Sequence, residues 1–445
     1  MSHSYEKKSV LQGHYTPADG DKFAEKYLSF LKSGTTERKC VDFLRAKAEE
    51  NGFVPFEKGK RYAAGDRVYL NNRGKAICFV VYGQQPMTAG LHITVAHIDS
   101  PRLDLKPNPL AENEGMLFLK THYYGGIKKY QWTALPLALE GVVIRKDGST
   151  VDVHDDKLTF CITDLLPHLA REQMKKTLAG GIEGEDLRVL AGTVPDENAE
   201  KDKIKENILN ILFEKYGIEE DDLQCAELTM VPNLEPAVLG FDQSMIGAYG
   251  QDDRVCAFTA FEALLQVEKP EKTAFVLLAD KEEIGSEGVS GMQSRFFERA
   301  LSLLSGGADL LEICAASKCL SADVNAAFDP IYPNVFDKQN TCLLGYGPCI
   351  TKYTGAGGKS GTNDASAELM RYFAQKMAED HVTYQTGELG KVDAGGGGTV
   401  AKFMSQRDID TVDIGVGLLS MHAPFEVATK ADVYETMRAM YAFMK

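Results

Sequence analysis

The stretch TAFVLLADKEEIGS, residues 273–286, is the most informative part of the chain, because an apolar run passes directly into a group of acidic residues. The composition of residues 273–278 predicts a buried strand. Asp280, Glu282 and Glu283 then crowd the end of that strand. Burying carboxylates there is costly unless a cation lies beside them. Taken alone, the stretch also fits a solvated acidic turn.

On both sides of this stretch, strand patterns alternate with helical ones. Helical periodicity is found at residues 22–31, 37–48, 255–265, 292–304, 364–378, 399–405 and 430–444. Short apolar runs typical of buried strands are found at residues 76–82, 91–97, 320–324, 382–386 and 411–416. Strands that are joined through helices need crossover connections. The sequence therefore predicts an α/β domain with a mostly parallel sheet flanked by helices.

The middle of the chain interrupts this alternation. Short β-rich stretches are found at residues 117–119, 141–145, 158–162 and 225–231, and an acidic, lysine-rich segment occupies residues 183–222. We therefore predict two domains. Residues 1–100 and 242–445 form the α/β domain, and residues 101–241 form an inserted β-rich domain.

Composition excludes several classes of protein. The formal net charge of −15 argues against binding to nucleic acid or to anionic membranes, which need basic surfaces. The nine cysteines include no C-x-x-C pair, which favours free thiols in a reducing compartment. The first twenty residues lack the apolar core of a secretory signal, and no apolar run approaches the ~20 residues needed to span a bilayer. We expect a soluble, cytoplasmic protein.

Further candidate ligands follow other strand-like runs. In AHIDSP, His97 and Asp99 lie two apart and point to one face of an extended chain, so the carboxylate can hold one ring nitrogen while the other faces a metal. Asp323 is embedded in an apolar run, and His422 lies just past one. Each has an ordinary alternative, such as a structural pair or a satisfied core histidine.

Asp252 and Asp253 open the helical pattern at residues 255–265. An aspartate there can serve as an N-cap or interact with the helix dipole in the first turn, which is the ordinary alternative for this pair.

Together these residues predict a metal centre. Open α/β sheets bind ligands at the carboxyl ends of their strands. Two imidazoles, three carboxylates and one spare glutamate suit two zinc-like ions, which a shared aspartate holds about 3.5–4 Å apart. Since adjacent side chains diverge, one of Glu282 and Glu283 can bind metal while the other faces a water.

Seven motifs, spread over nearly the whole chain, resemble the aspartyl aminopeptidase family, which also includes the vacuolar aminopeptidase of yeast. They are AHIDSPRLDLKPNP from Ala96, YYGGIKKYQW from Tyr123, GQDDRVCAF from Gly250, DKEEIGSEG from Asp280, SADVN from Ser321, GTNDASAE from Gly361 and SMHAPFE from Ser420.

The resemblance implies a zinc-exopeptidase fold and a set of site residues. The implied metal ligands are His97, Asp252, Glu283, Asp323 and His422, with Asp252 bridging two ions. It also implies Glu282 as the general base and Asp99 as the residue that orients His97. The metal would be zinc, with cobalt or manganese as alternatives. The inserted domain would mediate dimerisation, and dimers would build a homo-oligomeric dodecamer.

The chain departs from the family pattern at two places. Residues 325–330 carry no histidine where relatives often have two, and LLPHLARE keeps only His168 of a two-histidine segment. His168 is a candidate for reaching a neighbour's active site, with an interface histidine as the alternative. Lys359 lies in a glycine-rich loop and is a candidate for attracting an acidic substrate side chain, with an exposed loop lysine as the alternative. These departures bear on the preference for acidic residues more than on the reaction.

A run of four glycines, residues 395–398, resembles a phosphate loop but lacks the lysine of that motif. A turn that allows close backbone approach is the preferred interpretation.

The function we expect is that of a metallo-aminopeptidase that removes N-terminal residues from peptides. Two metals would activate a water, and Glu282 would take its proton. A related amidohydrolase acting on N-acyl amino acids is one alternative. A non-catalytic self-assembling particle is the other.

Overall fold

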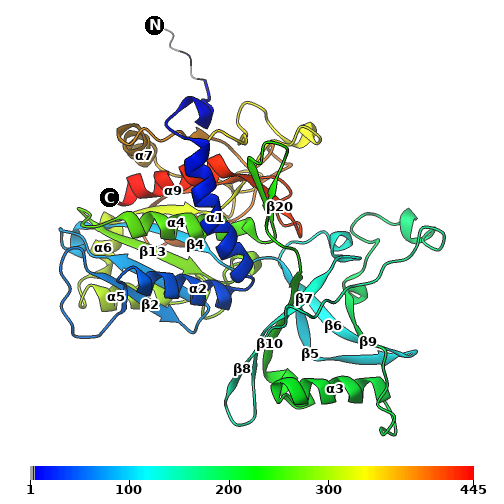
Figure 1. Ribbon diagram of the computed structural model, residues 1–445. Coiled ribbons are helices and arrows are strands. Elements are labelled where there is room, and N and C mark those ends of the chain that lie inside the picture. Colours follow the sequence, from blue (N-terminus) through cyan, green and yellow to red (C-terminus); the bar gives the residue numbers. More distant parts are fainter. Residues whose placement is uncertain (1–3, 5) are drawn as a thin grey trace. The chain divides into compact units, whose positions relative to one another are not determined.

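The computed structural model describes residue 4 and residues 6–445, which form two compact units (Figure 1). The first unit comprises residues up to 99, residues 236–421 and residues 426–445. The second unit comprises residues 100–235 and the short segment 422–425. Nearly all of the second unit is therefore one insertion into the chain of the first.

The first unit is built on a nine-stranded sheet. Its four central strands, in the order β13–β4–β14–β18, are parallel to one another, while β3 and β16 join them in antiparallel fashion on either side. The predicted α/β fold with a mostly parallel sheet is confirmed. In sheet order the strands are β1 (Val54–Pro55), β2 (Arg67–Asn72), β3 (Ala76–Val81), β13 (Thr273–Ala279), β4 (Leu91–His97), β14 (Lys318–Ala322), β18 (Asp410–Gly415), β16 (Cys349–Thr351) and β17 (Gln385–Thr386).

Helices cover both faces of this sheet, so its central strands are almost entirely buried. Alternate residues of β13 enter two separate apolar clusters, with Val276 in one and Leu277 in the other. The first cluster is closed by α1 (Pro17–Ser33), α2 (Glu37–Glu50), α4 (Gln251–Gln266), α7 (Ala367–Glu379) and α9 (Lys430–Met444). The second is closed by α5 (Phe296–Leu304), α6 (Leu310–Ala316) and α8 (Ala401–Ser405).

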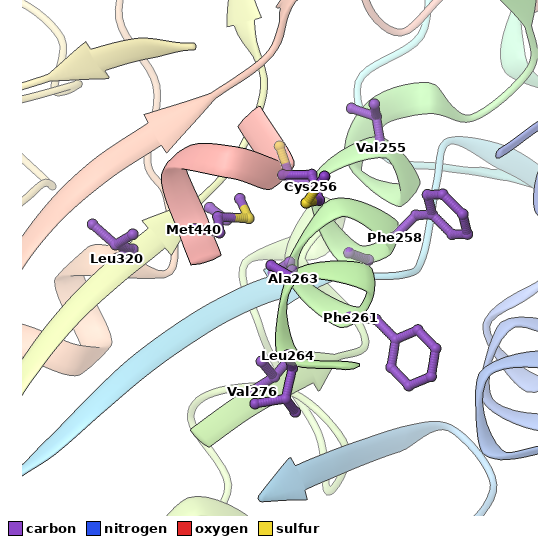
Figure 2. Packing of buried hydrophobic residues seen from close by; sticks show 14 of the residues in the cluster. Val255, Cys256, Phe258, Phe261, Ala263, Leu264, Val276, Leu320 and Met440 are labelled. Carbon is purple, nitrogen blue, oxygen red and sulfur yellow. The ribbon is translucent and has the colours of Figure 1, made fainter. Parts of the chain in front are cut away.

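Helix α4 lies at the centre of the first cluster (Figure 2). Its side chains Phe258, Phe261 and Leu264 are buried together with Val276 of β13 and Met440 of α9. This packing fixes the start of α4, where the acidic residues of the metal centre lie.

A small antiparallel sheet contains the two strands that precede α4 in the chain and one strand from near its C-terminal end. It consists of β11 (Ala237–Leu239), β12 (Met245–Ala248) and β20 (Glu426–Thr429), with Ala248 opposite Glu426. A two-stranded parallel sheet, formed by β15 (Asn325–Ala326) and β19 (Gly417–Leu418), follows Asp323. Both small sheets hold the chain next to the ends of the central strands.

The second unit contains a six-stranded antiparallel sheet in the order β8–β7–β10–β5–β6–β9. The strands are β5 (Arg102–Asn113), β6 (Met116–Tyr124), β7 (Leu137–Ile144), β8 (Thr150–Val153), β9 (Arg188–Gly192) and β10 (Ala226–Pro232). The strand expected at residues 158–162 is wrong, because that stretch makes only isolated bridges to Leu137 and Leu190.

The acidic segment of the second unit contains a helix, α3 (Lys203–Tyr216), that was not predicted from the sequence. Ile204, Ile208 and Leu212 repeat every four residues and were the available signal. Among the described residues, no helix is both long enough and apolar enough to cross a membrane.

Candidate metal centre

Three parallel strands end at one edge of the large sheet. Strand β4 lies between β13 and β14, and it ends at His97. Glu282 and Glu283 come three and four residues after the end of β13, and Asp323 immediately follows β14. Since neighbouring parallel strands finish at the same edge, the fold brings these side chains together.

The fourth element of the centre is the turn between β12 and α4. Gly250 has a φ of +69°, and a Cβ there would lie 2.4 Å from Nη1 of Arg254, so the position favours glycine. Asp252 and Asp253 follow with non-helical backbone angles, although they open α4. This geometry turns their side chains toward His97 instead of along the helix.

The ring of His97 is buried and oriented by its surroundings. Its Nδ1 lies 3.0 Å from the carbonyl oxygen of Asp99 and 3.3 Å from Oδ1 of Asp99, so Nδ1 carries the proton that is donated to them. The other nitrogen, Nε2, has no hydrogen bond of good geometry. It faces Oδ1 of Asp252 at 3.3 Å, Oε2 of Glu282 at 3.9 Å and Oδ1 of Asp323 at 4.0 Å. An imidazole held in this way presents its lone pair to a metal.

The charges around His97 favour a cation. Burial by itself lowers the pKa of His97, but the adjacent carboxylates of Asp252 and Asp99 outweigh it and raise that pKa well above its usual value. Burial raises the pKa of Asp323 well above the ordinary range, and the nearby Asp253 raises it further. Grouping several buried carboxylates is unfavourable unless positive charge is supplied.

Two sets of ligand atoms meet at this point. The first is offered by His97, Asp252 and Glu283, and the second by His97, Asp253 and Asp323, with the atoms of each set within 4.8 Å of one another. Imidazole nitrogen and carboxylate oxygen are donors that zinc accepts. The residues present therefore fit a zinc centre.

Asp99 connects the histidine with the glutamates. Its Oδ1 accepts a hydrogen bond from the backbone N–H of Glu282 at 3.1 Å, and its Oδ2 accepts one from the N–H of Glu283 at 3.2 Å. These two residues begin the single-turn helix η7 (Glu282–Ile284). One buried carboxylate thus fixes the His97 ring and the turn that carries both glutamates.

Asp253 belongs to the cluster although the sequence favoured a helix-capping role for it. Its Oδ2 accepts a hydrogen bond from the backbone N–H of His97 at 3.3 Å. Burial raises the pKa of Asp253 well above its usual value.

The remaining predicted ligand, His422, belongs to the second unit. There its Nδ1 donates to the carbonyl oxygen of Gly126 at 2.8 Å, which leaves Nε2 as the acceptor. The structure therefore brings together His97, Asp99, Asp252, Glu282, Glu283 and Asp323, and it groups His422 with the other unit.

Two substrate-binding candidates lie outside this cluster. His168 is exposed on an irregular segment of the second unit. Lys359 is exposed in the first unit, where its Nζ pairs with Oδ2 of Asp364 at 3.1 Å and lies 3.7 Å from the ring centre of Tyr353. The glycine run makes a close backbone approach, as expected, since a Cβ on Gly396 would lie 2.6 Å from Cα of Ala356.

A buried histidine among carboxylates at the carboxyl edge of such a sheet is the arrangement expected of a metal-binding protein. The sequence pattern of the family described as aminopeptidase I zinc metalloprotease (M18) matches residues 30–444. A probable M18 family aminopeptidase 1 from Clostridium acetobutylicum is 48% identical over 435 residues, which cover 94% of each chain. The chain belongs to the M18 family of zinc aminopeptidases, and the predicted resemblance is confirmed.

Solved structures agree with this assignment. The crystal structure of an M18 family aminopeptidase from Thermotoga maritima has a TM-score of 0.96 at 43% identity, covering 99% of this chain and 100% of that chain. The S. cerevisiae mApe1 dodecamer has a TM-score of 0.76 at 20% identity, covering 95% and 96%, and shows likeness of fold alone. The prediction of a metal-dependent aminopeptidase, a hydrolase acting on peptide bonds, is confirmed through the family.

Proposed function

We propose that the protein is a two-metal aminopeptidase whose ions are held by His97, Asp252, Glu283, Asp323 and His422. The observation that carries the proposal is the buried Nε2 of His97, which faces carboxylates from three separate elements. When bound, zinc lowers the pKa of a coordinated water to about 7 and polarises the scissile carbonyl. Cobalt or manganese are the alternatives to zinc.

Asp252 is assigned as the carboxylate shared by the ions, in preference to its neighbour. One oxygen of Asp253 is already engaged by the N–H of His97, whereas Oδ1 of Asp252 faces Nε2 of that histidine. Asp253 would then fix the backbone of His97 by accepting its N–H, without binding an ion.

Glu282 is assigned as the general base. Its Oε2 lies 3.9 Å from Nε2 of His97, at the edge of the ligand cluster, while its backbone is fixed by Asp99. In this position it can take a proton from the attacking water and pass it to the departing amine. Asp99 is assigned as the residue that orients His97.

A panel of aminoacyl-arylamides tests the activity. We expect turnover of substrates with a free α-amine, restored to the metal-free protein by zinc, and no turnover of the same substrates after N-acetylation. A carboxylate of the cluster would hold the free amine, so the chain is cut one residue in. Preferential cleavage of the acetylated substrates would instead identify an amidohydrolase for N-acyl amino acids.

A preference for acidic N-terminal residues is proposed through Lys359, and we expect it to be small. An acidic side chain must compete with Asp364 for this exposed lysine, and exposed ion pairs contribute about 1 kcal/mol or less. The ratio of kcat/KM for Asp-arylamide over Leu-arylamide should fall by about twofold to fivefold in Lys359→Ala. Lys391→Ala is the control, since its lysine lies near Lys359 on the same cavity of the first unit. An unchanged ratio in Lys359→Ala would remove Lys359 from substrate selection.

For assembly, we propose a dodecamer built from dimers through the second unit. Within residues 165–178 of that unit, five large apolar side chains are between 51% and 74% exposed, namely Leu165, Leu166, Leu169, Met174 and Leu178. Exposure of several large apolar side chains within one short segment favours a protein interface. His168 lies among them. A cytoplasmic location is proposed because all nine cysteines are free thiols.

A mixing experiment tests whether His168 acts across a subunit boundary. His168→Ala should lower kcat with little change in particle mass. Mixed particles of His168→Ala and Glu282→Gln should regain activity, because some sites would combine an intact Glu282 with a neighbour's intact His168. Absence of recovery, with subunit exchange shown by mass measurement, would confine His168 to its own subunit.

A further inference from the structure

Buried carboxylates accept the backbone N–H groups of the residues that carry the metal ligands. Asp253 accepts the N–H of His97, and Asp99 accepts those of Glu282 and Glu283. A third carboxylate does the same for Asp252, whose N–H donates to Oε2 of Glu426 at 3.0 Å. Asp253 and Asp99 lie within the cluster already described, whereas Glu426 is not a member of the two groups of ligand atoms around His97.

Glu426 contacts the turn that carries Asp252 through both its backbone and its side chain. Glu426 begins β20 and lies opposite Ala248, the last residue of β12. Its carbonyl oxygen accepts a hydrogen bond from Nε2 of Gln251 at 2.7 Å, while its side chain accepts the N–H of the next residue, Asp252. The backbone and the side chain of one glutamate therefore fix two consecutive residues of the turn.

The turn needs such support because it is not helical. Asp252 has φ −78° and ψ 108°, so no helical ladder fixes its backbone angles. A buried N–H without an acceptor is unfavourable, and a carboxylate is a stronger acceptor than a neutral group. Glu426 itself is only 1% exposed, and burial is unfavourable for a carboxylate. An apolar residue on β20 would serve packing at lower cost.

We propose that Glu426 is a positioning residue for zinc binding, which holds the backbone of Asp252 so that its carboxylate points at Nε2 of His97. This inference rests on the proposed function, in which Asp252 is a zinc ligand. The proposed role requires a side chain as long as that of glutamate, with an acceptor oxygen at its end.

Three variants separate the effect of side-chain length from the effect of charge at position 426. Glu426→Gln keeps an oxygen at the same place and should bind zinc within about threefold of the unchanged protein, because it retains the acceptor. Glu426→Leu removes the acceptor, and Glu426→Asp keeps the charge but withdraws the acceptor. Both should weaken zinc binding by about tenfold to a hundredfold, the range for partners of metal ligands. Affinity is measured by competition with a chromophoric zinc chelator on the full chain.

Glu435 supplies a matched control. It is also a glutamate 1% exposed, and its Oε2 accepts the backbone N–H of Thr383 at 3.1 Å, but it lies on α9 and supports no metal ligand. Glu435→Leu and Glu435→Asp should lower the thermal stability of the metal-free protein without weakening zinc binding beyond about threefold. If Glu426→Leu fails to fold, Glu426→Asp and Glu426→Gln decide the matter.

The outcomes are distinct. The inference is overturned if Glu426→Asp binds zinc as tightly as the unchanged protein, if Glu426→Gln loses as much affinity as Glu426→Asp, or if the Glu435 variants lose as much. Asp252→Asn tests the premise separately. Unchanged zinc binding in Asp252→Asn would refute the ligand assignment, whereas loss there with full binding in Glu426→Asp would refute only the role of Glu426.

Discussion

Glu282→Gln should lower kcat by at least about a hundredfold while zinc content and thermal stability stay unchanged. The amide has the shape of the carboxylate but cannot accept a proton from water. The backbone N–H of residue 282 remains bonded to Asp99, so the adjacent Glu283 should keep its position. Turnover of Leu-arylamide and metal analysis of the same preparation measure the two quantities.

Glu287→Gln is the matched control for this variant. Glu287 is exposed on the same loop, and its Oε1 accepts a hydrogen bond from Nε2 of Gln293 at 2.9 Å. It should retain normal turnover. Near-normal kcat in Glu282→Gln with full metal occupancy would remove Glu282 from the role of general base.

Asp252→Ala should cost the protein both metals, whereas His97→Ala or His422→Ala should each mainly weaken one. A shared carboxylate serves two ions and a histidine serves one. Removal of Asp252 also leaves Nε2 of His97 without the carboxylate oxygen that lies 3.3 Å from it. Metal content after dialysis against a buffered zinc concentration gives the stoichiometry.

Asp253→Asn is the informative comparison, because this neighbour also lies within the ligand groups around His97. The amide oxygen of the substituted side chain can still accept the N–H of His97, so we expect two equivalents to remain. Two equivalents in Asp252→Ala, or loss of metal only in Asp253→Asn, would show that the bridging assignment is wrong.

The sequence predicts the central strands better than the edge strands for a physical reason. Strand β4 has the predicted bounds, 91–97, and all seven of its residues are buried, so apolar residues predominate along it. The edge strand β17 is two residues long and is set by pairing with β16, which lies far away in sequence. Helix α3 is difficult to predict from the sequence, because charged residues surround its apolar repeat.

The candidate site was predictable where a polar residue follows an apolar strand. His97 and Asp323 stand at strand ends that only a parallel arrangement brings together. The sequence alone also fits a helix-terminal role for Asp253, because nothing in it reveals the non-helical backbone at the start of α4. The pairing of Lys359 with Asp364 depends on a loop conformation that no periodicity encodes.

The order of strands in the large sheet has a consequence for synthesis on the ribosome. Strand β4 emerges early, yet both of its neighbours, β13 and β14, are made only after residues 100–235 have been translated. Those intervening residues are contiguous and supply nearly all of the second unit, so that unit can form first. Until β13 and β14 have been made, the growing polypeptide carries β4 with both of its edges unpaired, and an unpaired strand is prone to aggregation. The strand ends that carry His97 and Asp323 can therefore meet only after translation has passed residue 323, and a nascent chain should depend on chaperones until that point.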